Sequence, residues 1–415
     1  MYFFKYRTAG HLEFSMLRRG EIYFPSYAEL NDANEFRPHF VLNGTEELWR
    51  RLSKFVLERV CFGPDFYREE RSRAIGELLR LSEPIAHQLK KFARNRDLSI
   101  DVFRKAFLAA LAEVSRDTAL EINWTLFTEL AADVITKQLP RSLEEQQYVA
   151  SFSTDATNPT MWGHYASAES GFVVVYESTD CTIHVNSPIT VLSGSRPSAN
   201  VIGATELGFY RDEHLKLHRV VYRHMPPKVN AFHRLIHQFS YSEEESHYDV
   251  PEQLYGDAPK KKDSIIGLVK FTDWSYEDEV RAFFPNWGVV PPDIRVLRVS
   301  PRQIRGLIFG PRMSQSDKAR AVICCHLMVA SAPREAGEVE EQGELSFFQA
   351  RQLTDRFAYK ILPVGVLEGS FFHDILPIKE INELDEPRAA KLREMASVLE
   401  TSRLSRRRRK ALEAS

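Results

Sequence analysis

The hydrophobic pattern of this chain changes its period twice, and this change limits the folds that the chain can adopt. Between residues 44 and 139 apolar residues recur every three or four positions, as in TEELWRRLSKFVLERV and DVFRKAFLAALAEV. Such spacing predicts amphipathic helices. The flanking segments contain the short alternating or apolar runs that are typical of strands. We therefore predict an α+β fold: a mixed or antiparallel β core from residues 1–43 and 149–385, an all-helical insertion at 44–148, and a charged helix or tail at 386–415.

Short segments of the core predict its individual elements. The predicted strands are YFFKYRT, EIYFPS, QYVASFSTD, GFVVVYES, HRVVYRH, RVLRVS, IRGLIFG and FAYKILPVG. The segments MWGHYASAES and SDKARAVICCHLMVAS predict helices. Residues 203–250 predict mixed helix.

Composition restricts the class of protein. The chain has 415 residues, of which 43% are hydrophobic, so two domains or one domain with a large insertion are expected. A net charge of −2 argues neither for nor against nucleic acid. The adjacent Cys324 and Cys325 suit neither a disulfide nor a C-x-x-C zinc site, so buried reduced thiols are expected. The first residues lack a signal-peptide core, and no apolar run approaches the roughly 20 residues needed to cross a bilayer. These features predict a cytoplasmic protein without a membrane partner.

The stretch WSYEDEVRAFFP, residues 274–285, contains the densest group of candidate site residues. Glu277, Glu279 and Arg281 stand at alternate positions, and on a β-strand they would share one face. Such a row of charges is costly to bury unless the charges are paired. One interpretation is a site that the acids face. The alternative is cross-strand ion pairing, with Arg281 neutralising one of the two acids.

Several motifs resemble a bacterial family known only as domain-of-unknown-function family 2971. They are KYR at 5–7, LNDANEF at 30–36, SFSTDATNPTMWGHYASAESGFVVVY at 151–176, W-x-x-E-x-E-x-R at 274–281 and IRGLIFGPRMS at 304–314. They follow the order found in the family. Where the family usually reads F-N-D-P-[FL]-E, this chain has Leu30 and Ala33. The helical insertion lies outside the resemblance.

The order of arginine, serine strand and Glu-x-Glu is also similar to the R-S-E signature of ADP-ribosyltransferases. This resemblance implies an ADP-ribosyltransferase-like fold with NAD as the substrate. It implies that Arg7 binds the NAD phosphates and that Ser151 and Ser153 hold the nicotinamide ribose in place. It also implies that Glu279 forms a hydrogen bond with the ribose 2′-hydroxyl and that Glu277 orients the acceptor. Cleavage of the nicotinamide–ribose bond builds positive charge on the sugar, which a fixed carboxylate would stabilise.

Aromatic residues and one histidine complete the candidate site. Tyr6, Trp162 or Tyr165 could stack on the nicotinamide, and His164 could act as a base. The alternative for Trp162 and Tyr165 is a place in the core or pocket wall, and for His164 an ordinary hydrogen bond.

The polar candidates have structural alternatives as well. Ser151 and Ser153 could form local bonds with the backbone. Arg7 could instead form an ion pair with Glu277 or Glu279.

The loop before the insertion also has two interpretations. Asn31, Asp32 and Glu35 could cap a helix. The Glu-x-Glu acids with Asp32 could hold Mg²⁺ in a nuclease, but no nuclease spacing supports this. No metal site is expected, and no nucleotide-binding glycine motif is present.

Two histidine pairs and a basic tail carry weaker interpretations. His214/His218 and His233/His237 have the i, i+4 spacing that can bind a metal on one helix face, against a solvated face as the alternative. The bases of Arg406–Lys410 could bind nucleic acid or acidic lipid, against a frayed terminus as the alternative.

The first hypothesis is an NAD-cleaving, ADP-ribosyltransferase-like enzyme, a bacterial toxin or phage-defence effector that acts on an unidentified macromolecular acceptor or on NAD itself. The second is a non-catalytic sensor module of a bacterial defence system that holds a nucleotide or a protein in the same cleft.

Overall fold

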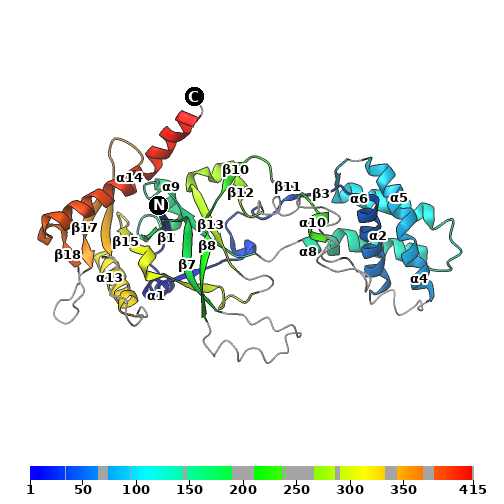
Figure 1. Cartoon of the computed structure of the whole chain (residues 1–415), viewed down its shortest axis with the longest axis horizontal. Helices are drawn as coiled ribbons and strands as arrows, with labels where there is room; N and C mark the ends of the chain where they lie inside the picture. Colours follow the sequence, from blue (N-terminus) through cyan, green and yellow to red (C-terminus); the bar gives the residue numbers. More distant parts are fainter. Residues whose placement is uncertain are drawn as a thin grey trace. The chain divides into compact units, whose positions relative to one another are not determined.

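A computed structural model of the chain divides into two units (Figure 1). The first comprises Met1–Glu35, Gln146–Arg223 and Lys270–Ser415, and the second Phe36–Glu145 and His224–Val269. The structure describes residues 1–32, 34–63, 73–94, 96–143, 147–188, 210–235, 239, 266–285, 290–331, 344–367 and 378–413, with the backbone alone beyond residue 401. Helices and mixed sheets together confirm the predicted α+β class.

A nine-stranded mixed sheet is the centre of the first unit, with the order β18-β17-β16-β15-β6-β1-β5-β13-β9. Its strands are β1 (Tyr2–Arg7), β5 (Val149–Ser153), β6 (Phe172–Glu177), β9 (His218–Arg219), β13 (Glu279–Phe283), β15 (Ile304–Phe309), β16 (Ser346–Gln352), β17 (Tyr359–Leu367) and β18 (Ile378–Glu380). Neighbours run antiparallel except β15 and β16, which are parallel. The sheet is therefore mixed, as the sequence predicts.

A smaller antiparallel sheet has the order β2-β14-β7-β8. Its strands are β2 (Glu21–Tyr23), β14 (Val296–Val299), β7 (Thr182–Pro188) and β8 (Tyr210–Lys216). Two further strands, β10 (Val221–Arg223) and β12 (Val269–Phe271), form a separate two-stranded sheet. Strand β8 differs from the mixed helix predicted for residues 203–250, whereas residues 232–235 of that range are helical. Residues 203–209, 236–238 and 240–250 lie outside the described residues.

Two hydrophobic cores cover the two faces of the nine-stranded sheet. Successive side chains of a strand point to opposite faces, so Phe3 enters one core and Phe4 the other. The first core also takes residues from the smaller sheet and from the helices α1 (His11–Arg19) and α13 (Gln315–Ala330). The second is covered by α9 (Pro159–Tyr165) and α14 (Glu386–Glu413). Short 3₁₀ turns connect these elements: η1 (Tyr27–Glu29), η6 (Thr272–Glu277), η7 (Pro301–Gln303) and η8 (Ile381–Glu383).

The second unit is mainly helical and has a core of its own. Its elements are α2 (Glu46–Cys61), α4 (Arg73–Arg80), α5 (Ser82–Ala93), α6 (Ile100–Val114), α7 (Trp124–Asp133), the π-helical turn η2 (Val134–Gln138), α8 (Leu139–Leu143) and α10 (Phe232–Leu235), with β3 (His39–Leu42), β4 (Leu98–Ser99) and β11 (Lys228–Asn230) in a three-stranded sheet. The Thr45 hydroxyl caps α2 by accepting from the Leu48 amide. The prediction of an all-helical insertion is wrong at β4, because two residues are too few to show a period in the sequence.

Cys324 and Cys325 lie in α13, and both are free and buried, as predicted. Within the described ranges, no helix is both long enough and apolar enough to pass through a membrane.

Candidate functional site

Strands β5 and β13 bring the serine and glutamate motifs together on one face of the central sheet. Glu279 is the cross-strand partner of Ser153, and Arg281 that of Ser151. The intervening Phe152 enters the hydrophobic core. Because side chains alternate along a strand, the polar side chains gather on the opposite face.

Glu277 reaches the same place by a different backbone path. The sequence predicts a strand through Glu277, but this prediction is wrong: η6 ends at Glu277, and β13 starts at Glu279. Between them Asp278 has a left-handed backbone conformation, with φ of 43°. Its carboxylate accepts a hydrogen bond of 2.5 Å from the Thr154 hydroxyl, and its carbonyl accepts one of 3.0 Å from the Thr154 amide, which stabilises this turn.

These side chains line a pocket of about 300 Å³ within the first unit. The other walls come from β1, from the segment between β2 and β3, from α9 and from β12. The lining residues are Phe4, Lys5, Tyr6, Pro25, Glu29, Leu30, Asn31, Glu35, Ser151, Phe152, Ser153, Met161, Tyr165, Lys270, Glu277, Glu279 and Arg281.

Lys270 is the centre of a buried charge cluster in the pocket wall. Its Nζ lies 2.7 Å from a Glu35 oxygen and 2.6 Å from a Glu277 oxygen. A Glu279 oxygen lies 3.5 Å away. All four side chains are at most 6% exposed, so the carboxylates depend on this ammonium for their compensation.

Arg281 supplies the second cation of the cluster. Its Nε lies 2.7 Å from one Glu279 oxygen, and its Nη2 lies 3.0 Å from the other. The same Nη2 also donates to Glu35. This two-point contact with Glu279 is the preferred geometry of an arginine–carboxylate pair, and it occupies both oxygens of that acid.

The two acids of the Glu-x-Glu motif have opposite pKa shifts. Burial alone would raise the pKa of Glu279, but Arg281 and Lys270 outweigh burial and lower it to about 2. Burial and the neighbouring charge of Glu279 raise the pKa of Glu277. Of the two acids of the Glu-x-Glu motif, Glu277 is therefore the one that binds a proton more readily.

Lys5 is the third cation of the pocket, and it is bonded differently. Strand β1 pairs with β5 only at Phe4 and Ser153, and the half-buried Lys5 donates from Nζ to the Ser151 carbonyl at 2.8 Å. Among the described residues no carboxylate forms an ion pair with Lys5. Burial and the charge of Arg7 lower the pKa of Lys5 to about 8.

Six of the predicted site residues line the pocket: Tyr6, Ser151, Ser153, Tyr165, Glu277 and Glu279. The Tyr165 hydroxyl donates to Glu277 at 2.5 Å and accepts from the Asn31 amide at 3.2 Å. The Ser153 hydroxyl donates to the Glu277 carbonyl at 2.7 Å, and the Tyr6 hydroxyl to the Asp155 carbonyl at 2.7 Å. These hydrogen bonds fix the orientation of the side chains that line the pocket.

Arg7 is not among the residues that line this pocket, so the pocket does not support its predicted role in phosphate binding. Its guanidinium pairs with Glu13 of α1 at 2.5 Å and donates to the Glu21 carbonyl at 3.1 Å. Arg7 is the last residue of β1, and these two contacts hold its guanidinium outside the pocket. The alternative pairing of Arg7 with Glu277 or Glu279 is not observed either.

Trp162 and His164 also lie outside the pocket lining. Trp162 is fully buried, with its indole nitrogen donating to the Ala156 carbonyl at 2.9 Å, so the core alternative is correct. His164 is exposed and lies 3.1 Å from the Tyr276 hydroxyl. The pocket therefore does not support a site role for these two residues, and from α9 only Met161 and Tyr165 line it.

Residues 161–282 match the family model described as protein of unknown function (DUF2971). This range includes Tyr165, Lys270, Glu277, Glu279 and Arg281, and it supports the first of the two resemblances. The comparisons give no support to the resemblance to ADP-ribosyltransferases. No curated protein and no solved structure matches the chain.

Two residues of the charge cluster had no predicted role in the site. Lys270 lies inside the DUF2971 match, in the apolar run GLVKF, where a lone charge suggests a buried ion pair. The sequence gives Glu35 a role only as part of a helix cap, but residues 34–36 form a turn and not a helix, and Asp32 accepts from the Asn34 amide at 2.9 Å in that turn. The Lys270 ammonium occupies the position between the carboxylates that the Mg²⁺ of a nuclease would need, so this arrangement does not suit that hypothesis.

Proposed function

We propose that the first unit is a binding module that holds a small anionic ligand of the nucleotide class in the pocket beside Lys5. One observation carries this proposal. Lys270 and Arg281 are compensated by carboxylates, whereas Lys5 lines the same pocket without an ion pair to any described residue. Two of its three N–H groups remain for a phosphate or carboxylate, since one donates to the Ser151 carbonyl.

The other lining residues suit the uncharged part of such a ligand. Phe4 and Tyr6 offer apolar surface, and the Tyr165–Glu277 pair can bond sugar hydroxyls. The volume of about 300 Å³ is at the lower end for ligand pockets, which favours a mononucleotide or part of a larger molecule over a protein segment.

Binding without cleavage is favoured over an NAD-cleaving reaction by the state of Glu279. Both of its oxygens are held by Arg281, so it does not present a free carboxylate to a sugar. The phosphate-binding arginine of the transferase hypothesis is also turned away from the pocket and paired with Glu13.

Isothermal titration calorimetry of the full chain tests the proposal. The ligands are inorganic phosphate, AMP, ADP-ribose and NAD. We expect one of the nucleotides to bind with one-to-one stoichiometry. Lys5→Met should weaken this binding about tenfold or more, because a hydrogen bond to a charged group contributes about 1.5–3 kcal/mol.

Two further variants make the test specific. Lys5→Arg retains the charge and should bind within a few-fold of the wild type, and Lys360→Met removes an exposed lysine of β17 and should change nothing. Binding that is equal in Lys5→Met and in the wild type would contradict the assigned position. An absence of binding across all four ligands would contradict the proposal itself.

A second candidate is the NAD-cleaving, ADP-ribosyltransferase-like activity that the sequence suggested. It is favoured by one arrangement: Ser151, Ser153 and Glu277 line the same pocket, and Glu277 has a raised pKa. Incubation with labelled NAD would then release nicotinamide, and Glu277→Gln would abolish the release. Intact NAD after prolonged incubation with the wild type would exclude this candidate while leaving the binding proposal in place.

The biological role that we propose for the binding module is that of a sensor in a bacterial phage-defence system. A macromolecular partner, and nucleic acid at the basic Arg406–Lys410 segment, belong to the same proposal. These bases lie in the last part of α14, and their side chains are outside the described part of the chain.

A further inference from the structure

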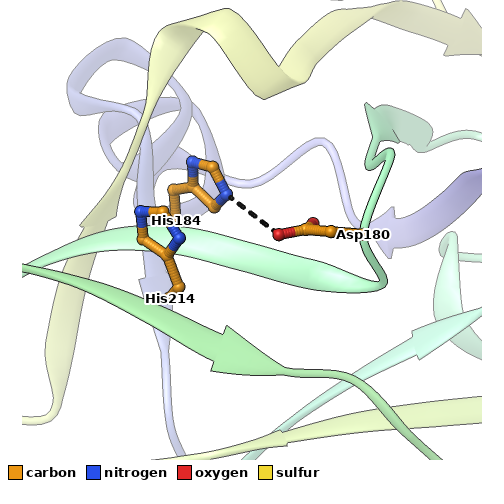
Figure 2. Close-up of side chains that lie close together, drawn as sticks. All are labelled: Asp180, His184 and His214. Atoms are coloured by element: carbon orange, nitrogen blue, oxygen red, sulfur yellow. Dashed lines mark ion pairs between the residues drawn. The ribbon is translucent and has the colours of Figure 1, made fainter.

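The β7–β8 hairpin of the first unit places two histidines side by side, away from the pocket. His184 of β7 and His214 of β8 are direct cross-strand partners. Figure 2 shows the two rings next to each other. They are stacked, with centroids 3.7 Å apart and planes 8° from parallel. The neighbouring Ile183 and Leu215 enter the core, so the two imidazoles lie on the opposite face of the hairpin.

Asp180 approaches this pair from the turn that precedes β7 (Figure 2). Its Oδ1 accepts from the Ser178 hydroxyl at 3.0 Å, from the Thr182 amide at 3.1 Å and from the Thr182 hydroxyl at 2.8 Å. The turn therefore fixes the carboxylate and leaves Oδ2 directed toward the His184 ring, 3.9 Å from its Nε2.

The His184 Nε2 atom lacks the partner that a buried nitrogen normally has. It is inaccessible to solvent, and it forms no hydrogen bond with any described residue. The distance of 3.9 Å to Asp180 is too long for a hydrogen bond. A buried polar atom of this kind requires an explanation, and a missing ion is one.

We propose that Asp180, His184 and His214 bind one divalent transition-metal ion, for which Zn²⁺ is the appropriate probe. One ligand atom from each residue lies within 4.8 Å of the other two. In a tetrahedral site with metal–ligand bonds of about 2.0–2.2 Å, the ligand atoms lie about 3.3–3.6 Å apart. Binding would therefore draw the three side chains closer together and turn the two imidazole rings out of their parallel arrangement. Imidazole with carboxylate is a donor set for zinc and its neighbours, and three protein ligands leave a position for water.

Carboxylates near the two histidines supply the negative charge that a bound cation needs. The hydrogen bond from Thr182 is the main cause that lowers the pKa of Asp180, to about 2, so its carboxylate is charged at neutral pH. Asp212 of β8 adds a further negative charge near His184.

The spacing of the histidines along the sequence indicates other pairs. His214 and His218 would share one face of a helix, but they lie in the strands β8 and β9, so they do not form such a pair. His233 lies in α10, and His237 lies outside the described residues. The cross-strand pair has no fixed spacing along the chain, because the register of the hairpin creates it.

Metal titration of the full-length protein tests the proposal after treatment with a chelator and removal of the chelator. We expect Zn²⁺ to bind with one-to-one stoichiometry in calorimetry and to raise the melting temperature, because an ion that binds only the folded state stabilises it. Co²⁺ in place of Zn²⁺ should give visible absorption bands typical of few-coordinate nitrogen and oxygen ligands. His184→Gln, His214→Gln and Asp180→Asn should each weaken Zn²⁺ binding about tenfold or more.

Two control variants locate the ion. His11→Gln removes an exposed histidine of α1, and Cys181→Ser removes the exposed thiol next to Asp180. Both should bind Zn²⁺ as the wild type does. Binding that survives in the His184→Gln/His214→Gln double variant would place the metal elsewhere and overturn the proposal. An absence of saturable binding in the wild type would show that the three residues form only a surface charge cluster, which overturns it as well.

Discussion

At the scale of single residues, Lys270 compensates the buried carboxylates of the pocket wall. It lies within ion-pair distance of Glu35, Glu277 and Glu279, and all of these side chains are buried. Replacement by Met would remove the ammonium and leave the carboxylates with Arg281 as their remaining cation. We expect Lys270→Met to lower the free energy of unfolding by about 3–5 kcal/mol, measured by urea denaturation, because the acids would be buried without compensation.

The matched control for this substitution is an exposed ion pair. Arg393 and Glu386 of α14 are 54% and 78% exposed, and Arg393→Met should cost less than about 1 kcal/mol. If Lys270→Met were no more destabilising than Arg393→Met, the charge cluster would not be buried as described.

Lys5 gives the proposed ligand binding a dependence on pH. Its pKa is lowered to about 8, so it carries its charge below that pH and loses it as the pH rises further. The affinity for ADP-ribose, whose phosphate charge is constant in this range, should therefore fall between about pH 7 and pH 9. Calorimetry across this range checks the expectation. Lys5→Arg should bind with constant affinity, and a wild-type affinity that is equally constant would contradict the role of Lys5.

At the scale of the elements, β15 and β16 approach each other closely at Gly306. Gly306 has a φ of 154°, and a Cβ atom at this position would lie 1.7 Å from the Ser346 carbonyl oxygen. Strand β6 pairs with β15 on the side opposite to β16, so β15 has little room to move away. We expect Gly306→Ala to destabilise the protein by more than about 2 kcal/mol, measured as a loss of the free energy of unfolding.

Gly163 of α9 is the control, because a Cβ atom there meets no atom within 4 Å. Alanine has a higher helix propensity, so Gly163→Ala should be neutral or stabilising by up to about 1 kcal/mol. Equal effects of the two substitutions would mean that β15 and β16 are not as close as described.

The elements differ in how far the sequence predicts them. Strands such as β1 and β6 have apolar or alternating residues along their whole length, and these strands are where the sequence places them. The path through the Glu-x-Glu motif was not predictable, because the left-handed turn at Asp278 depends on Thr154 from a distant segment. The same limit applies to the pocket: alternation along β13 predicts that Glu279 and Arg281 share a face, but their bonding to Glu35 exists only in the folded chain.

At the scale of the whole molecule, two units with separate cores predict more than one unfolding transition. Phe107 is fully buried in the core of the second unit, and Phe172 is fully buried in the first. Phe107→Ala should lower the midpoint temperature of one calorimetric transition, and Phe172→Ala that of another. Each substitution should reduce the free energy of unfolding of its own unit by about 3–5 kcal/mol. A single transition that both substitutions lower equally would mean that the two units unfold together.

The proposal that the pocket of the first unit binds a small anionic ligand without cleaving it is best tested by a crystal structure of the full chain with the nucleotide that binds it in calorimetry. We expect an intact ligand in the pocket, with a phosphate oxygen within hydrogen-bond distance of Lys5 Nζ and with the Arg281–Glu279 contact unchanged. A cleaved ligand, ligand density elsewhere on the protein, or an empty pocket at a saturating concentration of that nucleotide would contradict the proposal.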